Sequence, residues 1–268
     1  MPFATVRGIR LHYAQIGAGE RLLFISGTGG DLRVRPGVLD TPLAARYSVL
    51  AYDQRGLGQS EIPDGPYTMA DYADDAAGLL DAVGWPDARV VGVSFGGMVA
   101  QELALRHSAR VTRLVLCCTS AGGAGGASYP LHTLAALPAD ERAVRQIEIS
   151  DTRRDARWRA AHPDAVRKLL DMAAAAATVG AGEPRRVEGA AMQLDARRRH
   201  DTWDRLEALR MPALLCAGAF DGIAPLANME AMARRIPRAD LRVYDGGHLF
   251  LVQDKRAYAE IAAWLAAA

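Results

Sequence analysis

The sequence lacks most of the features that mark secreted, membrane-spanning or nucleic-acid-binding proteins. It has only three cysteines, Cys117, Cys118 and Cys216, which lie in apolar runs without metal-ligand spacing. This small, odd set predicts buried reduced thiols in a cytoplasmic protein. No apolar run approaches the roughly 20 residues of a membrane span, and the N-terminus lacks the apolar segment of a signal peptide. A net charge of +1 gives no electrostatic reason to expect nucleic acid or a membrane surface as a partner.

What the sequence does have is an alternation of strand-like and helix-like segments. With 268 residues, half of them hydrophobic, the chain can form one sizeable core. Short runs rich in Val, Ile and Leu are typical of parallel strands that are buried on both faces. We expect strands at residues 3–6, 10–16, 22–25, 48–52, 88–93, 111–117, 213–217 and 241–244. Alternation with helices predicts an α/β fold, with a mostly parallel eight-stranded sheet covered by helices on both faces.

One region interrupts this alternation. Residues 122–209 contain several helix signals and no convincing strand. We therefore expect a helical insertion, or cap, over residues 122–209, in a core formed by residues 1–121 and 210–268. An insertion at the carboxyl end of a parallel strand sits over the place where open α/β sheets bind ligands. In the core, Thr68 and Asp71 resemble a capping box at the start of a helix that Gly84 ends.

The motif that indicates a catalytic function is Gly92-Val93-Ser94-Phe95-Gly96, which matches G-x-S-x-G and lies between a predicted strand and a predicted helix. Small residues at 92 and 96 let neighbouring chains approach a sharp turn that holds the serine in a strained conformation. The following helix then aims its free N–H groups at any negative charge that develops beside Ser94. This context predicts a nucleophile, and the alternative interpretation is an ordinary turn with a capping serine.

With this motif the sequence resembles the α/β-hydrolase superfamily over nearly its whole length. Residues 51–60, "AYDQRGLGQS", and residues 66–75, "PYTMADYADD", match two further family segments, in which we interpret Asp53 and Arg55 as loop-shaping. The family's order of nucleophile, acid and histidine implies roles for two more residues. His248 follows the last strand beside Gly246 and Gly247, and is implied to be the base. In most members of the family the acid follows the preceding strand, which implies Asp221. A minority carry the acid one strand earlier, but residues 113–123 contain no carboxylate.

The glycine-rich segment "SGTGGDLR" at residues 26–33 raises a nucleotide-binding alternative. A dinucleotide-binding loop would need a third glycine at position 32, which is leucine, and a P-loop would need a Gly-Lys-Ser/Thr sequence that is missing. In the family this loop supplies half of the oxyanion hole, so the resemblance implies that the backbone N–H groups of Thr28 and Phe95 bind the oxyanion. The family usually has histidine where this chain has Ser26.

The resemblance implies a carboxylic ester hydrolase, an esterase or lactonase, that acts on a small and apolar molecule through a Ser94–His248–Asp221 triad and an acyl-enzyme. No metal or organic cofactor is expected. Length, the absent His-Gly pair and the strand end "LVLCCTSAGG" are similar to those of 3-oxoadipate enol-lactonases. C–C bond hydrolases, perhydrolases and hydroxynitrile lyases share such a triad, and a non-catalytic binding protein on this fold is a further alternative.

The substrate pocket is the part that the sequence defines least. An apolar pocket beneath the insertion has as candidate lining residues Tyr129, Leu131, Trp158, Met172, Met192, Trp203, Leu249 and Phe250. Ordinary helix packing explains the aromatic and methionine positions of the insertion equally well. The natural substrate and the choice between monomer and homodimer stay open.

Overall fold

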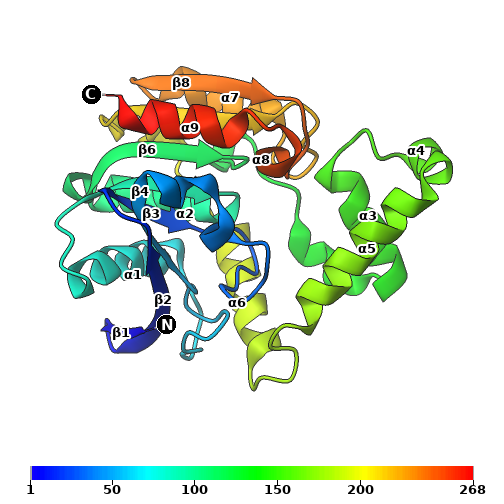
Figure 1. Ribbon diagram of the computed structural model, residues 1–268, viewed down its shortest axis with the longest axis horizontal. Helices are drawn as coiled ribbons and strands as arrows, with labels where there is room; N and C mark the ends of the chain where they lie inside the picture. Colours follow the sequence, from blue (N-terminus) through cyan, green and yellow to red (C-terminus); the bar gives the residue numbers. More distant parts are fainter. Residues whose placement is uncertain (1, 268) are drawn as a thin grey trace.

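The sheet contains the eight strands that the sequence predicts, in the order β1-β2-β4-β3-β5-β6-β7-β8 (Figure 1). The computed structural model describes residues 2–267. The strands are β1 (Phe3–Val6), β2 (Ile9–Ile16), β3 (Glu20–Ile25), β4 (Tyr47–Tyr52), β5 (Ala88–Val93), β6 (Val111–Cys117), β7 (Ala213–Gly218) and β8 (Ala239–Tyr244). β2 pairs antiparallel with β1 and β4, and every other neighbouring pair is parallel. The prediction of a mostly parallel eight-stranded sheet is confirmed.

Helices cover both faces of this sheet, and the alternating side chains of each strand supply the two cores. In β3, Leu23 and Ile25 belong to the core that also contains residues of helices α1 (Met69–Ala82), α2 (Phe95–Arg106) and α7 (Leu226–Arg235). Leu22 and Phe24 of the same strand point to the other face, where α9 (Ala257–Ala266) packs. Because both faces are buried, these strands have continuous apolar runs instead of an apolar–polar alternation.

The predicted capping box at the start of α1 is confirmed. Thr68 Oγ1 accepts a hydrogen bond from the Asp71 N–H at 3.1 Å, and the Asp71 carboxylate accepts one from the Thr68 N–H at 3.0 Å. At the C-terminal end of the chain the short helix α8 (Phe250–Gln253) precedes α9, and the Asp254 carboxylate between the two helices accepts backbone N–H groups of Asp245 and Arg256.

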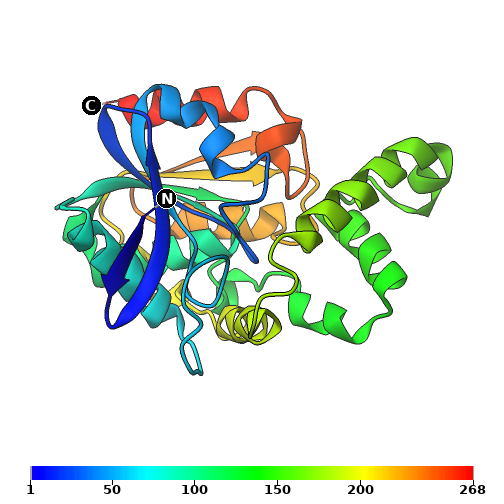
Figure 2. The ribbon, with the colours of Figure 1, turned by 60° about the horizontal axis from the view of Figure 1, so that its bottom comes forward.

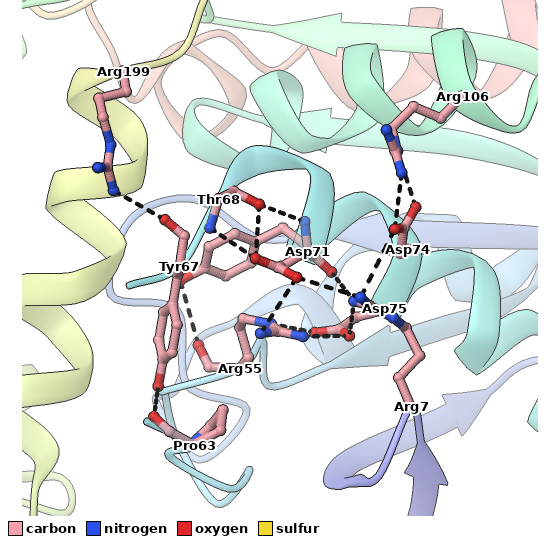
Figure 3. Close-up of polar contacts among 11 residues, drawn as sticks. Arg7, Arg55, Pro63, Tyr67, Thr68, Asp71, Asp74, Asp75, Arg106 and Arg199 are labelled. Atoms are coloured by element: carbon pink, nitrogen blue, oxygen red, sulfur yellow. Dashed lines mark hydrogen bonds and ion pairs between the residues drawn. The ribbon is translucent and has the colours of Figure 1, made fainter. Parts of the chain in front are cut away.

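A buried ion pair fixes the segment after β4 to α1 (Figure 3). Arg55 Nε and Nη2 donate to the two carboxylate oxygens of Asp75 at 2.6 and 2.7 Å. Arg7, from the turn between β1 and β2, reaches the same carboxylate at 3.2 Å. The Asp75 side chain is only 1% exposed. Burial raises the pKa of Asp75, although the Arg55 guanidinium opposes this shift.

The helical insertion lies between β6 and β7. It contains α3 (Ala139–Ser150), α4 (Ala156–Ala161), α5 (Pro163–Thr178) and α6 (Arg186–Arg198), and no strand is found within residues 122–209. Figures 1 and 2 show α3, α4 and α5 projecting from one side of the core, with α4 farthest from the sheet. α5 has no buried residue. Within the described residues no helix has both the length and the apolar character needed to cross a membrane.

α6 differs from its neighbours in the insertion because it lies against the core. Its buried residues are Gly189, Gln193, Ala196 and Arg197, which recur at the three- and four-residue spacing of one helix face. A Cβ at position 189 would lie only 3.0 Å from the Gly56 Cα, and nearer still to the Gly56 carbonyl. Glycine at this position therefore lets α6 approach the loop after β4.

Candidate active site

Ser94 occupies a sharp turn between β5 and α2. Its φ of 56° and ψ of −117° lie in a region that residues with a side chain rarely adopt. The Ser94 N–H donates to the Cys117 carbonyl at 2.8 Å, which ties the turn to the end of β6. A Cβ at Gly92 would lie 2.8 Å from the Gly96 carbonyl carbon, and one at Gly96 would lie 2.6 Å from the Ser26 carbonyl oxygen. The two glycines thus permit the crowding that the motif predicts.

Three side chains from three strand ends form one hydrogen-bonded line. His248 Nε2 lies 2.9 Å from Ser94 Oγ, and His248 Nδ1 lies 2.8 Å from Asp221 Oδ2. The other Asp221 oxygen accepts the N–H groups of Ile223 and Ala224 at 2.7 and 2.9 Å. Asp221 is therefore an acceptor that holds the proton of His248 on Nδ1 and leaves Nε2 free to take the Ser94 proton. The structure brings together the three residues to which the resemblance assigns nucleophile, base and acid.

The loop after β3 borders Ser94. A Cβ at Gly27 would lie 3.3 Å from the Ser94 Cβ and 3.9 Å from its Oγ. Neither the Thr28 N–H nor the Phe95 N–H has an acceptor within residues 2–267. Phe95 is the first residue of α2, where free N–H groups and the helix dipole favour a negative charge. Two backbone donors beside a serine can stabilise an oxyanion.

Asp53 shapes the loops at this end of the sheet, as the sequence predicts. Its carboxylate accepts the N–H groups of Leu32 at 2.7 Å and Gln59 at 3.0 Å, and contacts His12 Nδ1 at 2.8 Å. His12 and Asp53 are thus a second buried histidine–carboxylate pair. They support the loop that follows Thr28.

Gln193 of α6 is a site residue that the sequence analysis missed. Its Oε1 accepts the Gly29 N–H at 2.9 Å, and its side chain is fully buried. This bond links the insertion to the loop that carries Thr28. The sequence shows only a polar residue within a predicted helix, and that signal does not identify its partner 164 positions away.

The segment from Ile149 to Thr152 is a second feature that the sequence analysis missed. The Ser150 carbonyl accepts the His248 N–H at 2.6 Å, and the Ile149 carbonyl accepts the Gly222 N–H at 3.0 Å. The Thr152 N–H donates to the Phe220 carbonyl at 2.9 Å. The end of α3 therefore holds the loops of both His248 and Asp221. Backbone bonds of this kind leave no side-chain pattern from which they could be predicted.

Cys118, Asp221 and His248 have possible metal-ligating atoms that all lie within 4.8 Å of one another. Burial and the nearby Asp221 charge raise the pKa of Cys118, so its thiol stays protonated at neutral pH. A metal ion would need the thiolate and would compete with the hydrogen bond between Asp221 and His248. The residues fit a proton relay better than a metal centre.

A cavity of about 310 Å³ opens beside His248, and its wall includes Ser26 and Gly27. The rest of the lining is mostly apolar, with side chains such as Phe24, Val38, Leu249, Leu251 and Tyr258. Ser26 therefore takes part in the wall where the family usually has histidine. The cavity also borders Val93, the residue before Ser94, and His248, whose Nε2 contacts Ser94 Oγ.

Of the predicted pocket residues that flank His248, only Leu249 lines this cavity. Phe250 is fully buried and stacks on Tyr244 with ring centroids 5.0 Å apart, so its prediction as a pocket residue is wrong. Tyr129 and Leu131 pack instead against the small cluster that contains Ile149 and Ile223. They lie next to the loop of Asp221, where the Tyr129 N–H donates to the Ile223 carbonyl at 2.7 Å.

The four candidates from the helices of the insertion and its exit also lie elsewhere. Trp158 stacks on His162, with ring centroids 4.7 Å apart, and Met172 is 55% exposed. The Met192 sulfur abuts Gly65, and Trp203 packs on Gly125 under the Arg235 guanidinium. None of these four side chains lines the cavity beside His248. The physical reason is that α4 and α5 project away from the sheet (Figure 2), whereas α6 presents its polar residues to the loops.

Comparison with known proteins adds support for the fold and the family. The sequence matches the family model of the alpha/beta hydrolase fold over residues 20–255. It is 31% identical to a poly(3-hydroxyalkanoate) depolymerase of Ectopseudomonas oleovorans, over 90% of this chain and 82% of that protein. It is 27% identical to 3-oxoadipate enol-lactonase 2 of Acinetobacter baylyi, over 95% of this chain and 92% of that protein. The crystal structure of the enol-lactonase from Burkholderia xenovorans LB400 is similar, with a TM-score of 0.78 at 27% identity and coverage of 98% and 99% of the two chains.

Proposed function

The chain belongs to the α/β-hydrolase family, and we propose that it hydrolyses a carboxylic ester or lactone of a small molecule with Ser94 as nucleophile. The observation that carries the proposal is the unbroken line of hydrogen bonds from Asp221 through His248 to Ser94 Oγ, at 2.8 and 2.9 Å. A serine is a weak nucleophile at neutral pH unless a base takes its proton. Here the base is in contact with the hydroxyl, and a buried carboxylate orients the base.

In the proposed mechanism, His248 Nε2 takes the Ser94 proton while Oγ attacks the carbonyl carbon. The tetrahedral oxyanion accepts hydrogen bonds from the Thr28 and Phe95 N–H groups, each of which can contribute about 3 kcal/mol to transition-state stabilisation. His248 then protonates the leaving alcohol, and water repeats the sequence on the acyl-enzyme. Gln193 and the Ile149–Thr152 segment hold the loops that carry these groups.

The ester or lactone class is supported by two observations. The cavity beside His248 is mostly apolar, which suits an uncharged ester or lactone better than a charged phosphate. Relatives that carry the names enol-lactonase and poly(3-hydroxyalkanoate) depolymerase are similar over most of this chain. C–C bond hydrolysis, perhydrolysis and hydroxynitrile cleavage use the same side chains and are separated by substrate tests.

The test is hydrolysis of p-nitrophenyl acetate and p-nitrophenyl butyrate by the wild type, Ser94→Ala and Ser108→Ala. We expect Ser94→Ala to lose at least a thousandfold in kcat. Ser108 is exposed on the short helix after α2, so Ser108→Ala is the matched control and should keep full activity. Ester hydrolysis that survives Ser94→Ala would refute the proposal. A folded wild type that hydrolyses neither esters nor a panel of lactones would favour a lyase, a C–C hydrolase or a binding protein.

A further inference from the structure

A second cavity, of about 140 Å³, lies between α6 and the segment after β6. Its lining includes Met98, Ser120, Ser128, Arg197 and His200. Hydrogen bonds connect residues in and beside this lining to the backbone carbonyl of Ser94. The Met98 N–H and the hydroxyl of Thr119, the neighbour of Ser120, both donate to the Ser94 carbonyl, at 3.3 and 2.8 Å.

Arg197 is the unusual residue in the lining, because it is a buried cation that has no counter-ion among the described residues. Its residue is only 6% exposed. Nη1 donates to the Tyr129 carbonyl at 2.8 Å, but Nε and Nη2 have no partner anywhere in the part of the chain that the structure describes. Burial lowers the pKa of Arg197 to about 10, so the guanidinium is still charged at neutral pH. A buried charge with two unused donors is costly unless an anion completes it.

Other arginines of this protein show what the free edge of Arg197 can hold. The edge formed by Nε and Nη2 grips a carboxylate with two hydrogen bonds in the pairs Arg33–Asp31, Arg55–Asp75, Arg106–Asp74, Arg153–Asp151, Arg185–Glu188 and Arg256–Asp254. In Arg197 the same edge has no acceptor among residues 2–267. Two parallel N–H groups match the two oxygens of a carboxylate.

Two neighbours in the lining add donors of the right kind. The Ser128 hydroxyl is buried and has no hydrogen-bond partner among residues 2–267. Burial lowers the pKa of His200 to about 4, so its ring is neutral at neutral pH and carries one N–H. The Ser120 carbonyl lies near that ring, but neither ring nitrogen makes a hydrogen bond of good geometry within the described chain.

We propose that this cavity binds a carboxylate, held by the Nε–Nη2 edge of Arg197 with Ser128 and His200 as further donors. The carboxylate is either a second, non-reacting group of the substrate or product, which rests on the proposed function, or a separate small acid. In the first case the substrate is an acidic ester or lactone, with its apolar part beside His248. Either source supplies the acceptors that the buried guanidinium lacks.

The first experiment measures binding without relying on activity. Succinate is titrated into the wild type, Arg197→Gln and Arg199→Gln in chloride-free buffer, by calorimetry and by the shift in thermal midpoint. Arg199 is the matched control, because it is an exposed arginine of the same segment whose guanidinium already donates to the Tyr67 carbonyl (Figure 3). It also pairs with Asp195. We expect Arg197→Gln to weaken succinate binding at least tenfold and Arg199→Gln to change it less than twofold.

Two results would overturn the proposal: no succinate binding to the wild type, or equal binding to the wild type and Arg197→Gln. Should Arg197→Gln fail to fold, Ser128→Leu fills the cavity while leaving the guanidinium in place, and it should abolish succinate binding equally. Retained binding in a folded Ser128→Leu variant would count against the cavity as the site.

The second experiment identifies the source of the carboxylate. Hydrolysis of p-nitrophenyl hydrogen succinate is compared with that of the neutral p-nitrophenyl acetate. If the carboxylate belongs to the substrate, Arg197→Gln raises KM for the acidic ester at least tenfold, leaves the neutral ester unchanged, and succinate inhibits competitively. If it is a separate acid, succinate binds without competing and Arg197→Gln affects both esters equally. Failure of both esters would count against the proposed hydrolase function, while the titration still decides the carboxylate site.

Discussion

Replacing Gly96 by alanine tests whether crowding at the Ser94 turn sets the geometry of the site. A Cβ at this position would lie 2.6 Å from the Ser26 carbonyl oxygen and closer still to that of Ile25, whereas real Cβ atoms keep at least 3.0 Å. The loop after β3 must therefore retreat from α2 by about 1 Å, and a misplacement of that size can cost about a hundredfold in rate. Because this loop carries Thr28, we expect kcat/KM for p-nitrophenyl butyrate to fall about a hundredfold.

The same substitution has a stability effect whose sign distinguishes crowding from simple helix propensity. Within a helix, alanine is favoured over glycine by up to about 1 kcal/mol, so without the clash Gly96→Ala would stabilise the protein. Overpacking typically costs about 1–3 kcal/mol, so with the clash we expect a lower free energy of unfolding in urea. Gly182→Ala is the matched control, since a Cβ there meets nothing within 4 Å. A Gly96→Ala variant that is as active as the wild type and more stable would refute the reasoning.

Three further predictions concern the charged groups. Asp221→Asn should lower kcat by about 10⁴-fold with little change in KM, because the amide no longer holds the His248 proton on Nδ1. Asp245 is exposed and pairs with Arg153, so Asp245→Asn should leave kcat unchanged. Equal losses of kcat in the two variants would contradict Asp221 as the acid. Burial alone would raise the pKa of Asp31, but hydrogen bonds from arginines outweigh it and lower the pKa to about 2. After a discount for solvent screening, Asp31 should therefore contribute about 1 kcal/mol to the free energy of unfolding above pH 4, and this contribution should be lost as the pH falls towards 2. The free energy of unfolding of Asp31→Asn, measured by denaturation at each pH, should lack this dependence on pH. Arg55→Met should lower the free energy of unfolding in urea by about 3 kcal/mol, because it leaves the buried Asp75 carboxylate without its main ion-pair partner. The double variant Arg55→Met/Asp75→Leu should recover most of this loss. An equal loss in the single and double variants would argue against a buried charge as the cause.

The sheet and its two cores could be predicted because they depend on patterns within short segments. Strands such as β5 and β6 are continuous apolar runs, and the parallel arrangement follows from their alternation with helices. The capping box at Thr68 is equally local. The separation of α8 from α9 at Asp254 depends in addition on the hydrogen bonds that this carboxylate accepts from the N–H groups of Asp245 and Arg256.

The lining of the cavity beside His248 depends on how whole elements are placed, which local patterns do not show. Trp158 and Met172 have the composition of pocket residues, but α4 and α5 carry them away from the sheet (Figure 1). Phe250 follows the loop of His248 yet turns into the core beneath Tyr244. Only Leu249 among these candidates borders the cavity beside the histidine.

By itself, the sequence determined the residues whose role depends on their position relative to a strand end. The glycines around Ser94 fix a turn, and the loops after the last two predicted strands carry Asp221 and His248 to the same edge, because parallel strands present their carboxyl ends together. Only the tertiary structure decided which distant groups support them. The contacts of Gln193 with Gly29, of Ser150 with His248, and the isolation of the Arg197 charge join segments far apart in the chain. Such contacts depend on the packing of whole elements, which no local pattern encodes.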